Sequence, residues 1–303
     1  MVNSHNLTRD DAFSSENLCN LDICPLDWTM YGYLPSLAAN ITFIVLFAML
    51  GAIHGYLGFR WKSWGFMAGM IAGCAAEILG YAGRIILHDS PFSYEGFLIQ
   101  IVCLTFAPVF YTASIYITLS KTIEFLDASL SRVKPKFFYW FFIPFDLVCL
   151  ILQALGGGMS AGSDGDDIGV DISMAGLVLQ VIVLVLFIIV FSDYMFRYWR
   201  SGHTARFTWR LKTFFAGLSI ATLLILIRCA YRVAELKDGY DGELFKDEAT
   251  FIVLEGVAIV LAAAALCFGH PGLLIKPSAI EGRSSSPSNR EKGFGSSGSS
   301  GPN

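Results

Sequence analysis

Seven stretches of about 20 mainly apolar residues recur along this 303-residue chain. A helix of about 20 apolar residues is the length that crosses the hydrocarbon core of a bilayer. Hydrophobic residues make up 54% of the chain and charged residues only 15%, a balance unlike that of soluble domains. The sequence therefore predicts an all-α membrane protein, a seven-transmembrane helix bundle with spans at 34–55, 64–87, 97–120, 137–159, 172–195, 214–234 and 250–268.

Basic residues are distributed unevenly between the two sides of these spans. Fifteen of the 21 lysines and arginines lie in the C-terminal tail or in the loops after the first, third and fifth spans. Three lie in the N-terminal tail and the loop after the sixth span, and the remaining three lie in spans. Because basic loops stay in the cytoplasm, we expect the N-terminus outside and the C-terminus inside. The expected organisation is an extracellular tail at 1–30, the helix bundle at 31–275 and a disordered Ser/Gly-rich cytoplasmic tail at 276–303.

The N-terminal tail carries features of an extracellular segment. Asn6 begins the sequon "NLT" and is a candidate for glycosylation. Cys19 and Cys24 are the only two of the seven cysteines outside the predicted spans, and an oxidising exterior favours a disulfide between them over two free thiols. The tail has no apolar core of a cleavable signal peptide, so the first span is expected to serve as the targeting signal.

The second span carries charged side chains where lipid would surround them. Glu77, Tyr81 and Arg84 lie on one helical face, because residues three, four and seven apart stack along a helix. An ionised side chain at mid-bilayer costs roughly 2.5–3.5 kcal/mol even on lenient scales. These charges therefore need partners.

The sixth span repeats this spacing with the signs reversed, in the order Arg228, Tyr231, Arg232 and Glu235. Both spans run in the same direction, and Glu77 and Arg228 lie 13 and 14 residues from the span starts, at a height of roughly 20 Å. Matched depth and opposite sign predict two pairs, Glu77 with Arg228 and Arg84 with Glu235. For the second pair, which lies near the rim, anchoring at the membrane surface is the alternative.

Other polar residues of the spans fall at comparable depths. Asn40, Gln180 and Glu255 each lie roughly 10 Å below the outer surface, and Asp146 and Gln153 share one face of the fourth span. Intramembrane polar groups normally face the bundle interior or a water-filled cavity. The set predicts an amphiphile-binding cavity in the outer half of the bundle. The alternative is that these side chains only hold helices together.

Pro108 and Pro144 interrupt the third and fourth spans. A proline inside a helix removes a hydrogen bond and produces a kink. Such kinks occur at binding or gating regions and equally as simple packing features.

Six short motifs resemble the fungal lipid-translocating exporter family, the RTA-like seven-span proteins. They are "YGYLPS" at 31–36, "EILGYAGR" at 77–84, "APVFYTASIY" at 107–116, "FDLVCLILQALGGG" at 145–158, "IRCAYRVAE" at 227–235 and "HPG" at 270–272. The resemblance implies a plasma-membrane protein that translocates amphiphilic lipids such as sphingoid long-chain bases and confers resistance to toxic amphiphiles. Its partner would be a membrane lipid or amphiphile, with no nucleic acid.

Several other functions of membrane proteins lack their sequence signatures here. The third span ends "YITLSK" and the seventh "CFGHPG", without the motifs of G-protein-coupled receptors, and no lysine for a retinal Schiff base occurs in the last span. The five histidines do not share one depth, as an intramembrane zinc site requires, and the loops contain no Walker motif. We therefore predict no enzyme, catalytic residue, metal or cofactor. A lipid-sensing receptor or regulator without transport is the alternative to a transporter.

Overall fold

The computed structural model describes residue 21, residues 23–29, 31–126, 128–162, 167–201 and 209–237, residue 242 and residues 244–272. Asn6, Cys19 and the predicted tail at 276–303 lie outside the described residues. Cys24 is buried and disulfide-bonded. Because Cys19 is not described, its pairing with Cys24 stays a prediction.

Within these described ranges, seven helices are long and apolar enough to cross a membrane. The described helices are the 3-10 helix η3 Leu26–Trp28, α1 Leu37–Trp61, α2 Trp64–Asp89, α3 Tyr94–Leu126, the 3-10 helix η4 Ala128–Leu130, α4 Pro135–Gly162, α5 Asp167–Arg200, α6 Trp209–Leu236, α7 Glu248–Phe251, the π-helix η7 Ile252–Val257 and α8 Ala258–Phe268. The last three follow one another directly and form the seventh span, Glu248–Phe268. The predicted seven-helix bundle is confirmed, and most helices extend a few residues beyond the apolar stretches that revealed them.

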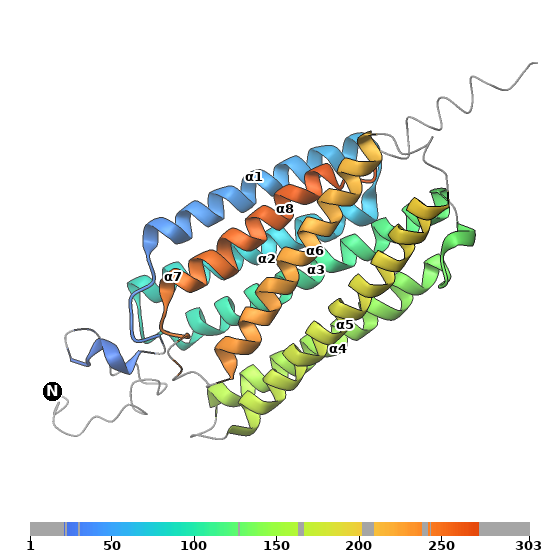
Figure 1. Cartoon of the computed structure of the whole chain (residues 1–303). Helices are drawn as coiled ribbons and strands as arrows, with labels where there is room; N and C mark the ends of the chain where they lie inside the picture. The colour runs from blue at the N-terminus through green and yellow to red at the C-terminus, as the bar shows by residue number, and fades with distance from the viewer. Residues whose placement is uncertain are drawn as a thin grey trace, which may run out of the picture.

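The helices form a bundle with two flanks (Figure 1). α4 and α5 pair along one flank, and α1, α2 and α8 make up the other, with α3 and α6 between the flanks. α2 packs mainly against α1 and α3, whereas α6 packs mainly against α8 and α5. We call the end where α1, α3, α5 and α7 begin the N-terminal end, and the other the basic end.

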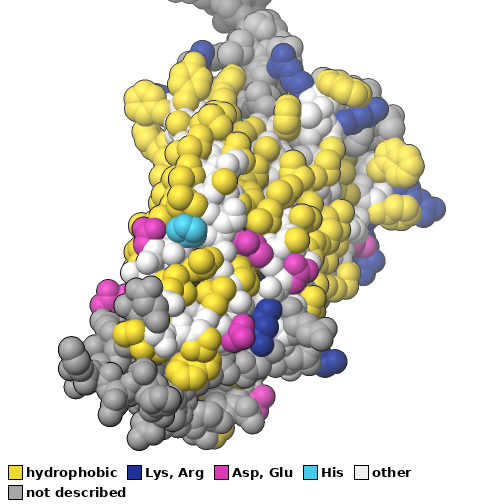
Figure 2. Space-filling model, turned by 90° about the vertical axis from the view of Figure 1, so that its left-hand side faces the viewer, with side chains coloured by type: hydrophobic (Ala, Val, Ile, Leu, Met, Phe, Trp, Pro, Cys, Tyr) yellow, Lys and Arg dark blue, Asp and Glu magenta, His cyan; other side chains and the backbone are white. Residues whose placement is uncertain are grey.

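The surface of the bundle suits a membrane. Figure 2 shows hydrophobic side chains over the middle of one face, Lys and Arg mostly toward the upper end and Asp and Glu toward the lower end. Large apolar side chains on several helices are exposed, among them Leu79, Leu147 and Ile189 at 55%, 54% and 59%. Exposed apolar side chains in such number indicate contact with lipid rather than water.

Glycines let α2 approach α3 closely. A Cβ atom on Gly73 would lie 2.6 Å from the ring of Tyr111, and one on Gly83 would lie 2.8 Å from the backbone nitrogen of Gln100 and 2.9 Å from the carbonyl oxygen of Gly96. Small residues at helix contacts bring two backbones together in membranes. This contact determines which face of α2, including Glu77, points into the bundle.

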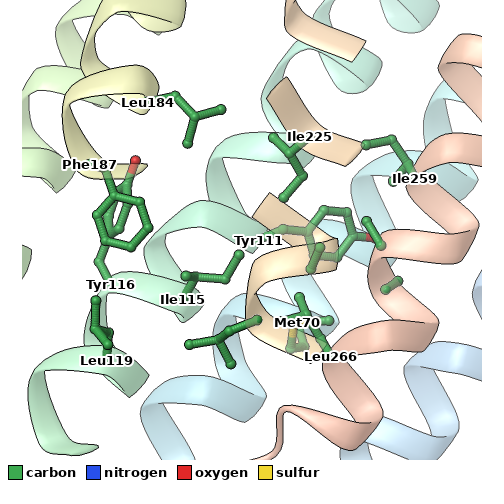
Figure 3. Close-up of a cluster of buried hydrophobic side chains, with 14 of the residues drawn as sticks. Met70, Tyr111, Ile115, Tyr116, Leu119, Leu184, Phe187, Ile225, Ile259 and Leu266 are labelled. Atoms are coloured by element: carbon green, nitrogen blue, oxygen red, sulfur yellow. The ribbon is translucent and has the colours of Figure 1, made fainter. Parts of the chain in front are cut away.

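Apolar side chains fill the interior toward the basic end (Figure 3). Met70, Tyr111, Ile225 and Leu266, from four different spans, belong to one buried cluster. The rings of Tyr116 and Phe187 lie 4.6 Å apart and join α3 to α5. The central side chains of the bundle are thus packed and apolar on one side of the charged residues described next.

Candidate functional site

A buried ion pair joins the sixth and seventh spans. The guanidinium of Arg228 on α6 donates to Glu255 in η7, and the two residues are 3% and 1% exposed. The same Nη2 atom also donates to the backbone carbonyl of Leu104 on α3, at 2.6 Å. Arg228 therefore links three spans near the middle of the bundle.

The carbonyl of Leu104 is available because of Pro108. In a regular helix the amide of residue 108 would donate to the carbonyl of residue 104, and proline has no amide hydrogen. A backbone carbonyl inside a membrane that lacks its helical amide donor needs a hydrogen-bond donor from another residue. Arg228 supplies it, so Pro108 has a definite role in this structure, which is to create a docking point for the guanidinium.

Glu255 lies in a π-helical turn, Ile252–Val257. The wider turn shifts the helical phase, so the residues after it face differently from a continuous α-helix. The next residue is Gly256, where a Cβ atom would lie 2.2 Å from the ring of Phe43 on α1. Such π-turns are frequent at functional sites, and the sequence pattern did not reveal this one.

Glu77 is buried near this ion pair, and its carboxylate lacks a hydrogen-bond partner among the described residues. Its side chain is only 1% exposed. Arg228 and Glu255 are the charged groups that act on it. The predicted direct pair of Glu77 with Arg228 is wrong, because α6 packs on α8 and its arginine is held by Glu255.

Arg84 is held at the N-terminal end of the bundle by residues of two other segments. Its Nη2 atom lies 3.5 Å from Glu248 of α7 and donates to the hydroxyl of Tyr33 at 3.1 Å. Its guanidinium carbon lies 4.1 Å from the ring centre of Phe251 and 5.3 Å from that of Tyr31, in the geometry of cation–π contacts.

Glu235 finds a partner on its own helix. It forms an ion pair with Arg232, three residues earlier, and accepts a hydrogen bond from Tyr231 at 3.3 Å. The predicted pair of Arg84 with Glu235 is therefore wrong as well. Arg84 and Glu235 are 1% and 3% exposed, so they are buried rather than anchored at a membrane surface.

The segment before α1 covers Arg84. Tyr31 stacks on Phe245 at 4.8 Å between ring centres and accepts a hydrogen bond from Gln100 at 2.6 Å, and Ser36 donates its backbone N–H to Glu248 at 2.6 Å. Burial raises the pKa of the Tyr33 hydroxyl more than the nearby guanidinium lowers it, so this phenol stays neutral. Residues 31–36 thus tie the N-terminal end of α1 to α3 and α7.

The remaining candidate residues do not join the central cluster, which we define as Glu77, Arg228 and Glu255. Gln153 and Gln180 bond to each other at 3.0 Å between α4 and α5, and Asp146 accepts a hydrogen bond from Thr112 at 2.9 Å between α4 and α3. Asn40 is buried, and its amide nitrogen has no partner among the described residues. Gln180 and Asp146 therefore make contacts that hold helices together, and the predicted layer is several separate clusters.

A partly open cavity of about 150 Å³ lies between α3 and α4. Its walls are mostly apolar and include Ile101, Val102, Phe106 and Gly157, with Gln153 at one side. Leu104, on the same helix, instead turns its side chain toward Gly80 of α2. The cavity is therefore on the opposite side of α3 from Glu77.

Comparisons with known proteins assign the chain to a family. The family described as RTA1 like protein matches residues 70–278, about two thirds of the chain. This protein belongs to the RTA1-like family. The sphingoid long-chain base transporter RSB1 of Saccharomyces cerevisiae is 32% identical over 84% of this chain and 75% of the relative.

Two further relatives of this RTA1-like protein are also from S. cerevisiae. Protein RTA1 is 28% identical over 80% of this chain and 84% of its own length, and protein RTM1 is 31% identical over 65% and 64%. No solved structure is significantly similar to the chain. The resemblance of the six sequence motifs to the RTA-like proteins is thus confirmed.

The family match includes all three residues of the central cluster of this RTA1-like protein, whereas Asn40, Tyr31 and Tyr33 precede it. Sequence reasoning missed Glu248, the partner of Arg84, because it lies in the loop-side turn of α7 rather than in an apolar stretch. It also missed the Leu104 carbonyl, although the position of Pro108 could have revealed it, since a helical proline frees the acceptor four residues earlier.

Proposed function

We propose that the protein moves amphiphilic lipids with a cationic head group, of the sphingoid long-chain base type, across the membrane. It acts at the plasma membrane with the N-terminus outside and the C-terminus in the cytoplasm, and it confers resistance to toxic amphiphiles. The relative named as a sphingoid long-chain base transporter supports the substrate class. The basic loops support the orientation.

The single observation that carries this proposal is that the buried carboxylate of Glu77 has no hydrogen-bond partner among the described residues. The head group of such a lipid is an ammonium, which loses its hydration when it enters the bundle and needs a negative partner there. Arg228 already satisfies Glu255, so a cation can bind Glu77 without breaking an existing pair. In a low-dielectric interior one such charge contact discriminates strongly between cationic and neutral head groups.

The test is transport by the purified protein in liposomes. We expect a fluorescent long-chain amine to cross vesicles that contain the protein faster than empty vesicles, and the neutral long-chain alcohol to show a smaller difference. Glu77→Gln should reduce amine transport at least tenfold. Glu124→Gln, on the exposed basic end of α3, is the matched control and should leave transport unchanged.

Saturable amine binding without transport would instead support a lipid-sensing receptor or regulator. If a correctly folded Glu77→Gln protein transported the amine at the wild-type rate and kept the wild-type preference for the amine over the alcohol, the proposed role of Glu77 in recognising the head group would be refuted.

A further inference from the structure

Glu77 differs from every other buried Asp, Glu or Arg side chain in the described part of the chain. Arg84 has Glu248, Arg228 has Glu255 and Glu235 has the partly buried Arg232, each as an ion pair. Asp146 accepts a hydrogen bond from Thr112. Glu77 alone makes neither a hydrogen bond nor an ion pair there.

The charges around Glu77 do not balance an additional negative charge. Two carboxylates, Glu77 and Glu255, face one guanidinium, Arg228, and this guanidinium is oriented by Glu255 and by the Leu104 carbonyl. An ionised Glu77 would leave the cluster with a net charge of −1 in a water-poor interior. A neutral, protonated Glu77 leaves it at zero, which costs far less there.

Among the described residues, no positively charged group other than Arg228 acts on Glu77. The titratable groups close to Glu77 are Cys74 and Tyr81 on α2 and Cys103 and Tyr111 on α3, which are neutral when protonated. From α1, the phenyl rings of Phe43 and Phe47 stack on Tyr81 at 4.8 and 6.0 Å. Within the described part of the chain no group is left to compensate an ionised Glu77, and a cation that comes from outside the protein could do so.

We propose that Glu77 is a proton-exchange site, which releases its proton when a cationic head group binds and takes it back when the cation leaves. This inference rests on the proposed function and adds that binding of the cationic lipid is coupled to release of a proton. The carboxylic acid loses H⁺ to water, and the carboxylate then forms an ion pair with the ammonium. One positive charge replaces another, so the net charge of the buried cluster does not change.

This exchange has a thermodynamic consequence. Protons and cations compete for one carboxylate, so the apparent affinity for the cation rises about tenfold per pH unit as long as Glu77 is protonated in the free protein. If the site faces the two sides alternately, the exchange makes the protein a proton–cation antiporter. A pH difference of one unit across the membrane then supports a tenfold gradient of the cationic lipid.

The experiment uses the full chain in phosphatidylcholine nanodiscs and dodecyltrimethylammonium as the probe. This cation is permanently charged and carries no exchangeable ammonium proton, so any proton released on binding comes from the protein. Binding is measured by calorimetry in two buffers of different ionisation enthalpy between pH 5 and 8, and proton release by a pH indicator at low buffer strength. Dodecanol serves as the neutral control ligand.

We expect about one proton released per cation bound at the acidic end of this range, and no release with dodecanol. Glu77→Gln should abolish the release and make the remaining, weaker affinity independent of pH, whereas Glu124→Gln should behave like the wild type. A glutamine replaces a protonated glutamate at nearly equal volume, so the variant is expected to fold.

Cation binding by the wild type without proton release at any pH would overturn the exchange and leave the proposed function standing. Proton release that persists in Glu77→Gln would also overturn it, because another group would be the source. Absence of both cation binding and amine transport would refute the proposed function itself. The wild-type stoichiometry is informative even if Glu77→Gln fails to fold.

Discussion

Removing Arg228 alone should destabilise the protein more than removing Arg228 together with Glu255. Arg228→Met leaves Glu255 as an unpaired carboxylate at 1% exposure, and breaking one partner out of a buried ion pair costs roughly 3–5 kcal/mol. It also leaves the Leu104 carbonyl without a donor, at a cost of about 1–3 kcal/mol. The double variant Arg228→Met, Glu255→Met keeps only the second of these costs.

Pro108→Ala provides a second, independent check of this reasoning. In the double variant the new alanine amide can donate to the Leu104 carbonyl and should recover about 1 kcal/mol. In the wild type the same change should not stabilise, because Arg228 already occupies that acceptor.

The assay is thermal unfolding of the detergent-solubilised protein, followed by the fraction that stays monodisperse on fluorescence-detected size exclusion. The two costs of Arg228→Met together come to about 4–8 kcal/mol. For a domain of this size 1 kcal/mol corresponds to about 2–4 °C, so this variant should lower the melting temperature by roughly 8–32 °C. The double variant should melt several degrees above the single one. The single variant Glu255→Met is measured as well. The coupling would be refuted if the double variant lost as much melting temperature as the two single variants together. It would also be refuted if Pro108→Ala stabilised the wild type and the double variant equally.

Three further predictions concern other parts of the structure. Gly83→Ala should lower the melting temperature, because its Cβ would meet α3 backbone atoms at 2.8–2.9 Å, while Gly158→Ala, with open space around it, should not. Glu248→Gln should cost about 1.5–3 kcal/mol, seen in the same assay, because the buried guanidinium of Arg84 loses its counter-charge. Burial, and to a smaller extent His54, lowers the pKa of His270 from 6.5 to about 4. The folded state thus binds fewer protons than the unfolded state between these values, so its stability should fall as the pH drops from 6.5 toward 4, and His270→Asn should flatten this decline.

Composition and spacing along the chain were sufficient to predict the seven spans. A bilayer imposes one length and one chemistry on every crossing helix, so each apolar stretch could be recognised without knowledge of its neighbours. The depth of polar residues was also predictable, because each residue advances a helix by a constant 1.5 Å. Glu77 and Arg228 were placed at similar depth, and electrostatic interaction between them agrees with that.

Only the tertiary structure decided which charges pair. Depth says nothing about which helix lies next to which, and α6 turns its arginine toward the seventh span because it packs on α8, while glycines draw α2 onto α3. Glu255 reaches Arg228 through a π-turn, and the second acceptor of Arg228 is a backbone carbonyl, which no side-chain pattern encodes. The unpartnered state of Glu77 follows from all of these contacts together, because it depends on where every neighbouring charge has already found its partner.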